Sequence, residues 1–150
     1  MKIAISIIIF LVLMTPLTCQ ILENPSRYFE SYSPQIHNGN WIPNIFPNDI
    51  SSIHETHNID TNEVWLRFET NTLKVSTKNF VKLASDEIIN LKIRQPFMAS
   101  WWFDGIIDQQ PSNDTVLYAN VYKGSCGTNK VAFLAVSKTS NINYWWCQSE

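Results

Sequence analysis

The sequence predicts an α+β fold from three patterns, of which two indicate strands and the third, apolar residues at helical spacing in 80–84, indicates a helix. Alternating apolar and polar residues from Ile53 onward indicate a β-hairpin, and three C-terminal runs rich in Val, Tyr, Phe and Trp indicate further strands. The chain has 150 residues, 45% apolar and 16% charged, so it is expected to fold as one domain and not to be disordered. We expect a signal peptide at residues 1–19, an irregular N-terminal arm at 20–40 and a single α+β domain at 41–150.

The N-terminus has the pattern of an export signal. Lys2 supplies a positive charge, and Ile3–Met14 is an apolar run interrupted only by Ser6. As a helix this run would span about 18 Å, well short of the roughly 30 Å hydrocarbon core of a bilayer. The run therefore predicts a cleaved secretory signal, and hence a protein of the periplasm or cell envelope, with secretion from the cell as the alternative.

Cys19 follows this run closely and leaves two interpretations open. The favoured one is cleavage near Cys19, which releases a domain that begins at about Gln20. The alternative is lipidation of Cys19, although Pro16, Leu17 and Thr18 match poorly the residues that usually precede a lipidated cysteine. Contact with a membrane is thus expected only through the signal or through such a lipid.

Removal or lipidation of Cys19 leaves Cys126 and Cys147 as a pair. In an exported chain an even pair most simply forms a disulfide. The bridge would close a loop of about twenty residues and stabilise the fold by roughly 3 kcal/mol.

The first elements of the domain follow from proline and from period-two patterns. Trp41–Pro47 is apolar but broken by prolines, so it is expected to be an extended segment packed on the core. Ile53–Ile59 and Val64–Phe68 alternate in polarity, and Asp60–Asn62 between them supplies turn chemistry. Together they predict the hairpin.

One main amphipathic helix of about ten residues is expected after Ser76–Thr77. Phe80, Val81, Leu83 and Ala84 follow at helical spacing, with lysines on the outer side.

Three strands complete the predicted fold. They are expected at Val116–Tyr122, Val131–Ser137 and Ile142–Cys147. Because the links between them are short, they predict a three-stranded antiparallel meander, with the helix packed on one face of the sheet.

Residues 41–70 resemble a group of small bacterial exported proteins. The similar positions are Trp41, Pro43, Pro47, Ile53, His57, Asp60, Thr61 and Phe68, and the later pair Trp101–Trp102 also looks similar. The group has no established activity, so the resemblance implies a bacterial envelope origin and transfers no catalytic residue.

His54, Glu55, His57 and Asp60 are the candidate metal ligands, because imidazoles and carboxylates lie close together there. Their spacing, H-E-x-H, differs from the H-E-x-x-H that places two imidazoles on one helix face. On a strand, His54 and His57 would face opposite sides. Solvated polar residues of a hairpin are therefore the favoured interpretation, and no cofactor is expected.

The chain contains six tryptophans, including two doublets. If one face of the sheet is open to water, Trp65, Trp102 and Trp145 would form an exposed aromatic patch there. Such a patch binds partners or stacks on sugar rings. The favoured alternative is that the N-terminal arm or the irregular stretch 94–112 covers this face.

Charge and motifs narrow the class of function. Eleven basic and thirteen acidic residues give no reason to expect nucleic acid as a partner. The sequence holds no G-x-S-x-G elbow and no phosphate-binding glycine loop, so an enzyme is not favoured. We expect a small exported, non-catalytic envelope domain that binds another envelope or secreted protein. The alternatives are a periplasmic immunity or inhibitor protein that acts against a toxin, a metal-dependent hydrolase built on the four candidate ligands, and a carbohydrate-binding module with exposed tryptophans.

Overall fold

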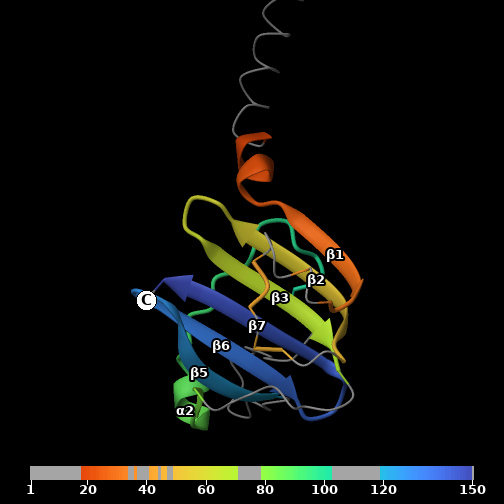
Figure 1. Cartoon of the computed structure of the whole chain (residues 1–150). Coiled ribbons are helices and arrows are strands. Elements are labelled where there is room, and N and C mark those ends of the chain that lie inside the picture. Colours follow the sequence, from red (N-terminus) through yellow and green to blue (C-terminus); the bar gives the residue numbers. More distant parts are fainter. Residues whose placement is uncertain are drawn as a thin grey trace, which may run out of the picture.

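The computed structural model forms one twisted antiparallel sheet (Figure 1). It describes residues 18–33, 36, 41–43, 45–46, 49–70, 79–102 and 119–149. Within those residues the sheet has seven strands in the order β1-β2-β3-β7-β6-β5-β4. The strands are β1 (Ser26–Ser31), β2 (Ser51–Asn58), β3 (Glu63–Glu69), β4 (Val81–Lys82), β5 (Ala119–Gly127), β6 (Lys130–Ser137) and β7 (Ile142–Ser149). Two short helices accompany them, at residues 18–23 and at Ser85–Ile89 (α2).

The α+β prediction was wrong, because the described chain is nearly all β. The expected main helix is absent from its described part, where Val81–Lys82 is strand β4 and pairs with β5. The apolar side chains that suggested one helix face do not lie together, and Val81 and Ala84 are exposed. Phe80 packs in the core on one face and Leu83 in the core on the other. The expected helix start at Ser76–Thr77 lies outside the described residues.

The arm at 20–40 was predicted to be irregular, yet it contains strand β1. This strand pairs antiparallel with β2, from Ser26 opposite Thr56 to Ser31 opposite Ser51. Most of its side chains are exposed, as befits a strand at the edge of the sheet. Its polar sequence therefore gives no alternating signal. Residues 1–17 lie outside the description, and in the part described no helix is long and apolar enough to cross a bilayer.

The hairpin lies where the period-two pattern predicts it, and β6 and β7 cover the predicted strands Val131–Ser137 and Ile142–Cys147. β5 starts three residues later than the predicted strand Val116–Tyr122 and continues five residues past its end. β2 pairs with β3, and β5, β6 and β7 pair in order, all antiparallel. The pairing of β3 with β7 joins the two groups into one sheet, with Trp65 opposite Trp146 and Glu69 opposite Ile142. The sheet is therefore continuous across elements that are more than seventy residues apart in sequence.

Each face of the sheet carries a hydrophobic core. The connection between β1 and β2 covers the first face and buries Tyr32, Ile36, Ile42, Phe46 and Ile50 against it. Residues 83–102, which include α2, cover the second face with a core that contains Ile88 and Trp102. Both faces are covered, so the central strands β6 and β7 are buried almost throughout, and most of their residues are apolar.

Polar contacts fasten residues 92–94 to the second face. The Arg94 guanidinium lies 2.6 Å from the buried Glu63 carboxylate. The Trp65 indole donates to the Arg94 carbonyl at 2.9 Å, and the Gln148 amide donates to the Lys92 carbonyl at 2.8 Å. These bonds satisfy buried polar groups of β3 and β7 and hold the covering segment in place.

Candidate functional site

A cavity of ≈ 440 Å³ opens on the first face at the end of the sheet. Trp41 and Ile45 of the β1–β2 connection form one wall, and Phe80 lies beside the β5–β6 hairpin. Trp145 of β7 contributes from the sheet itself. The lining is therefore assembled from segments that are far apart in sequence, and it is rich in aromatic rings.

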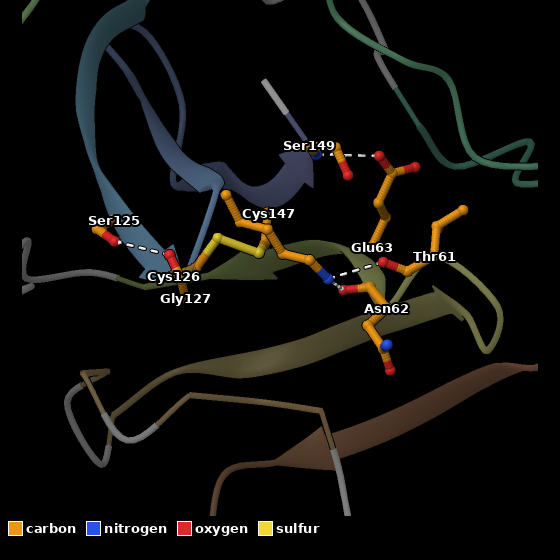
Figure 2. The surroundings of a disulfide bond; sticks show 9 residues. Thr61, Asn62, Glu63, Ser125, Cys126, Gly127, Cys147 and Ser149 are labelled. Carbon is orange, nitrogen blue, oxygen red and sulfur yellow. Dashed lines mark hydrogen bonds between the residues drawn. A yellow bond between two sulfur atoms is a disulfide. The ribbon is translucent and has the colours of Figure 1, made fainter.

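The disulfide Cys126–Cys147 forms part of the cavity lining, and Figure 2 shows it between β5 and β7. The two Cα atoms are 6.0 Å apart. β5 carries a bulge between Ser125 and Gly127, so Cys126 has no partner in β6 and is free to turn toward β7. The β6 residue paired with Cys147 is Ala132, whose small side chain leaves room for the bridge. The pair predicted from the sequence is thus present in the structure.

Lys130 lies at the rim of the cavity, where β6 begins. Its ammonium group donates to the backbone carbonyls of Thr61 and Asn62, each at 2.7 Å. These bonds tie the β2–β3 turn to the β5–β6 hairpin, and they hold a cation beside a largely apolar cavity. Asn62 has a φ of 52°, a left-handed conformation that asparagine adopts more readily than most residues.

Gly124 allows the segment at Asn79–Phe80 to approach β5 closely. A Cβ atom at this position would lie 3.0 Å from the Asn79 carbonyl oxygen and 3.0 Å from the Phe80 ring. Any larger residue would push Phe80 away from the cavity that it lines. The lack of a side chain at Gly124 therefore determines how close to β5 the Phe80 wall of the cavity lies.

Behind the Trp41 wall lies a buried pair of ionisable side chains. Glu55 Oε1 and His57 Nδ1 share a hydrogen bond of 2.5 Å, and both side chains are almost fully buried. The Trp41 ring stacks on the His57 imidazole. Within the described chain, Oε2 of Glu55 has no hydrogen-bond partner. Burial raises the pKa of Glu55 above its ordinary value, although the His57 contact opposes this.

The structure does not bring the four candidate metal ligands together. Glu55 and His57 share the first face, whereas His54 lies on the second, between the rings of Tyr28 and Trp101. Asp60 is exposed in the β2–β3 turn. Among the residues described, no group of three or more His, Cys, Asp or Glu side chains is placed to hold a metal ion.

The three candidate binding tryptophans are buried and do not form an exposed patch. Trp65 and Trp102 belong to the core of the second face, beneath residues 83–102. Trp145 belongs to the first face, where it lines the cavity, so it does not share a face with the other two. Trp146, next to it in sequence, points to the second face, as expected for adjacent residues on a strand.

Cys19, the candidate lipidation site, is exposed on the helical residues 18–23. Its thiol donates to the Glu23 carboxylate at 2.9 Å. That hydrogen bond raises the pKa of the Cys19 thiol, so the thiol is less readily ionised than usual.

Comparison with known proteins finds a similarity to one family over part of the chain. The family model of the YbbD head domain matches residues 23–69, about a third of the chain. The chain is therefore similar to that domain over β1, the β1–β2 connection, β2 and β3. This range contains Trp41, Glu55 and His57 but not the disulfide or Lys130. No curated protein and no solved structure matches the chain significantly.

Sequence reasoning missed the cavity. The sequence predicts Trp41 only as part of a segment packed on the core, and Lys130 carries no signal at all. The disulfide is the one available clue, because it brings the end of β5 to β7. Nothing in the sequence places Phe80 beside that bridge.

Proposed function

We propose that this chain is an exported binding domain that holds a protein partner by taking an apolar side chain of that partner into the cavity. The observation that carries the proposal is the cavity itself, lined by Trp41, Phe80, Trp145 and the disulfide. Its ≈ 440 Å³ lies in the range of pockets that receive ligands. One or two large side chains would fill it.

The composition of the site favours a protein as the ligand. Interface hot spots are aromatic pockets surrounded by polar rims that exclude water. Here the rings form the wall, while Asn62, Ser125 and Thr128 contribute polar groups to the lining. The Lys130 ammonium uses two of its donors on backbone carbonyls and has three in all, so one is available to a partner's carbonyl or carboxylate.

The walls of the cavity are held in place by the sheet and the disulfide, which lowers the entropy lost on binding. Trp145 lies on a central strand, and the disulfide holds β5 to β7. Gly124 lets Phe80 sit close to the sheet. A preformed pocket loses less entropy on binding than one that must be ordered by the partner.

Export is the second part of the proposal. The apolar run Ile3–Met14 supports it, and so does a disulfide, since such bonds persist in oxidising compartments. The site of action would then be the cell envelope or its surroundings.

Selection of peptides tests the binding function even though the partner is unidentified. A random peptide library displayed on phage would be selected on the wild-type protein, and selected peptides would then be measured against two variants. Thr128→Trp places a large ring at the cavity, whereas Thr139→Trp makes the same change in the β6–β7 turn, away from the cavity lining.

We expect peptides with a shared aromatic or large aliphatic residue that bind wild type and Thr139→Trp equally and Thr128→Trp at least tenfold more weakly. On binding, the indole N–H resonances of Trp41 and Trp145 should shift in NMR spectra, while that of Trp65, bonded to the Arg94 carbonyl, should not. Equal binding to both variants, or no enriched peptide, would contradict the proposal.

A further inference from the structure

Four large hydrophobic side chains gather at one end of the molecule, separate from the cavity lining. In the part of the chain that the structure describes, Leu22 and Met98 are each 74% exposed, Ile59 is 50% exposed and Ile21 is 49% exposed. Only Tyr28 and Val81 are comparable among the described residues. Such gathering is unusual on a soluble surface, where exposed apolar side chains are normally scattered.

Specific contacts bring these residues together from three segments. The Ile59 amide donates to the Glu23 carbonyl at 2.9 Å, which places the β2–β3 turn beside the helical residues 18–23. Ile21 and Met98 line one recess together with Pro25. Figure 1 shows the helical residues 18–23 projecting from the end of the sheet beside β1. We call Ile21, Leu22, Ile59 and Met98 the apolar end.

The backbone at Met98 adopts an unfavourable conformation. Its φ is 53°, a left-handed conformation that costs a non-glycine residue energy. The chain thus adopts an unfavourable turn where it presents a long, flexible hydrophobic side chain to the outside. Methionine is well suited to irregular apolar surroundings such as lipid.

The chain itself indicates what covers the apolar end. The apolar run Ile3–Met14 ends four residues before Thr18, and four residues span at most about 14 Å. Whenever that run is held in a membrane, Thr18 lies within about 14 Å of it, and the helical residues 18–23 that carry Ile21 and Leu22 begin there. A lipid on Cys19, three residues from Leu22, would bring these residues equally close to the membrane.

We propose that, in the chain that retains its N-terminal apolar run or carries a lipid on Cys19, the apolar end rests on the lipid–water interface of the membrane. The contact depends on hydrophobic insertion and not on net charge, because charges of both signs lie beside the apolar end: Glu23 and Asp60 are acidic, and the Lys130 ammonium is bonded to the β2–β3 turn. The bilayer that fits is therefore a zwitterionic one. This inference does not depend on the function of the cavity.

A fluorescent probe on the full chain tests the contact. In a Cys19→Ser background the introduced thiol is the free one, since Cys126 and Cys147 are bonded to each other. Asp60→Cys places a nitrobenzoxadiazole label beside Ile59. Thr139→Cys is the matched control, because Ile142 pairs with Glu69 and so the β6–β7 turn lies at the opposite end of the sheet.

The labelled chains would be reconstituted into phosphatidylcholine vesicles that contain nitroxide-labelled lipid. We expect at least twofold quenching and a blue shift at position 60, and no change at position 139. In the chain with Leu22→Ser and Met98→Ser, quenching at position 60 should fall to the level of position 139, while flotation shows that it still associates with the vesicles.

Three results would overturn the proposal. Equal quenching at both positions indicates non-specific adsorption. Unchanged quenching after the two serine substitutions indicates that the tether alone brings the label near lipid. A blue shift that grows with protein concentration in detergent micelles, without nitroxide quenching in vesicles, shows that a second copy of the chain covers the apolar end.

Discussion

Trp41 stacks on His57 with ring centroids 4.7 Å apart and ring planes inclined by 24°. One residue is a wall of the cavity, and the other is hydrogen-bonded to the buried Glu55. The stack therefore connects the cavity to the ionisable pair behind it. A change of charge on Glu55 is expected to alter how firmly Trp41 is held.

Glu55→Gln should reduce the loss of stability at rising pH. Burial raises the pKa of Glu55 above its ordinary value of 4.5, so the folded protein binds this proton more tightly than the unfolded chain does. The stabilisation by Glu55 is complete below pH 4.5 and is lost as the pH rises through the folded-state pKa. Urea titrations from about pH 4 upward would measure this. An equally steep fall in the variant would contradict the assignment to Glu55.

His54→Phe should reduce the loss of stability at falling pH. Burial lowers the pKa of His54 below 6.5, and the nearby Arg67 contributes to this, so the unfolded chain binds the proton more tightly. The wild-type protein therefore loses stability as the pH falls below 6.5, and the variant should lose less. Phenylalanine keeps a ring between Tyr28 and Trp101. Identical pH profiles for the two proteins between about pH 5 and 8 would show that His54 does not contribute.

Local patterns predicted local pairing and little else. The period-two patterns around Ile53 and Val64 identify a hairpin because successive residues of a strand face opposite sides of a sheet, and turn residues separate the two runs. The pairing of β3 with β7 has no local signature, since the partners are some eighty residues apart. The helix was predicted wrongly because Phe80 and Leu83 have helical spacing but pack on opposite faces of the sheet.

Local sequence patterns could not predict the cavity either, because its lining residues are far apart in sequence. Its lining comes from the β1–β2 connection, from Phe80 and from the β5–β6 hairpin, and only the finished sheet brings these together. The disulfide was predictable because it needs only two cysteines and an oxidising compartment. Exposure of the tryptophans could not be judged, because it depends on whether the long connections cover the faces.

Trp102→Ala should destabilise the fold strongly, because the side chain is part of a core and not of a free surface. Its ring meets Tyr144 and Trp146 edge to face, with centroids 5.4 and 5.9 Å away. Loss of a buried aromatic ring typically costs about 3–5 kcal/mol. Chemical denaturation would measure this, with Trp101→Ala, a partly buried neighbour, as the comparison. A cost below about 1 kcal/mol would mean that residues 83–102 do not hold Trp102 on the sheet.

Cys126→Ser should lower the free energy of unfolding by about 2–5 kcal/mol, because the bridge restricts the unfolded chain across 21 residues. Cys19→Ser, at an exposed thiol outside the core, should change it little and is the matched control. A reducing agent should destabilise the wild type by a similar amount, because reduction and the substitution remove the same disulfide. It should leave Cys126→Ser unaffected. Because the bridge lines the cavity, Cys126→Ser should also weaken peptide binding beyond what the Thr139→Trp control shows. Three titratable thiols in the native wild-type protein, or equal stability of all these forms, would show that the two sulfurs are not joined.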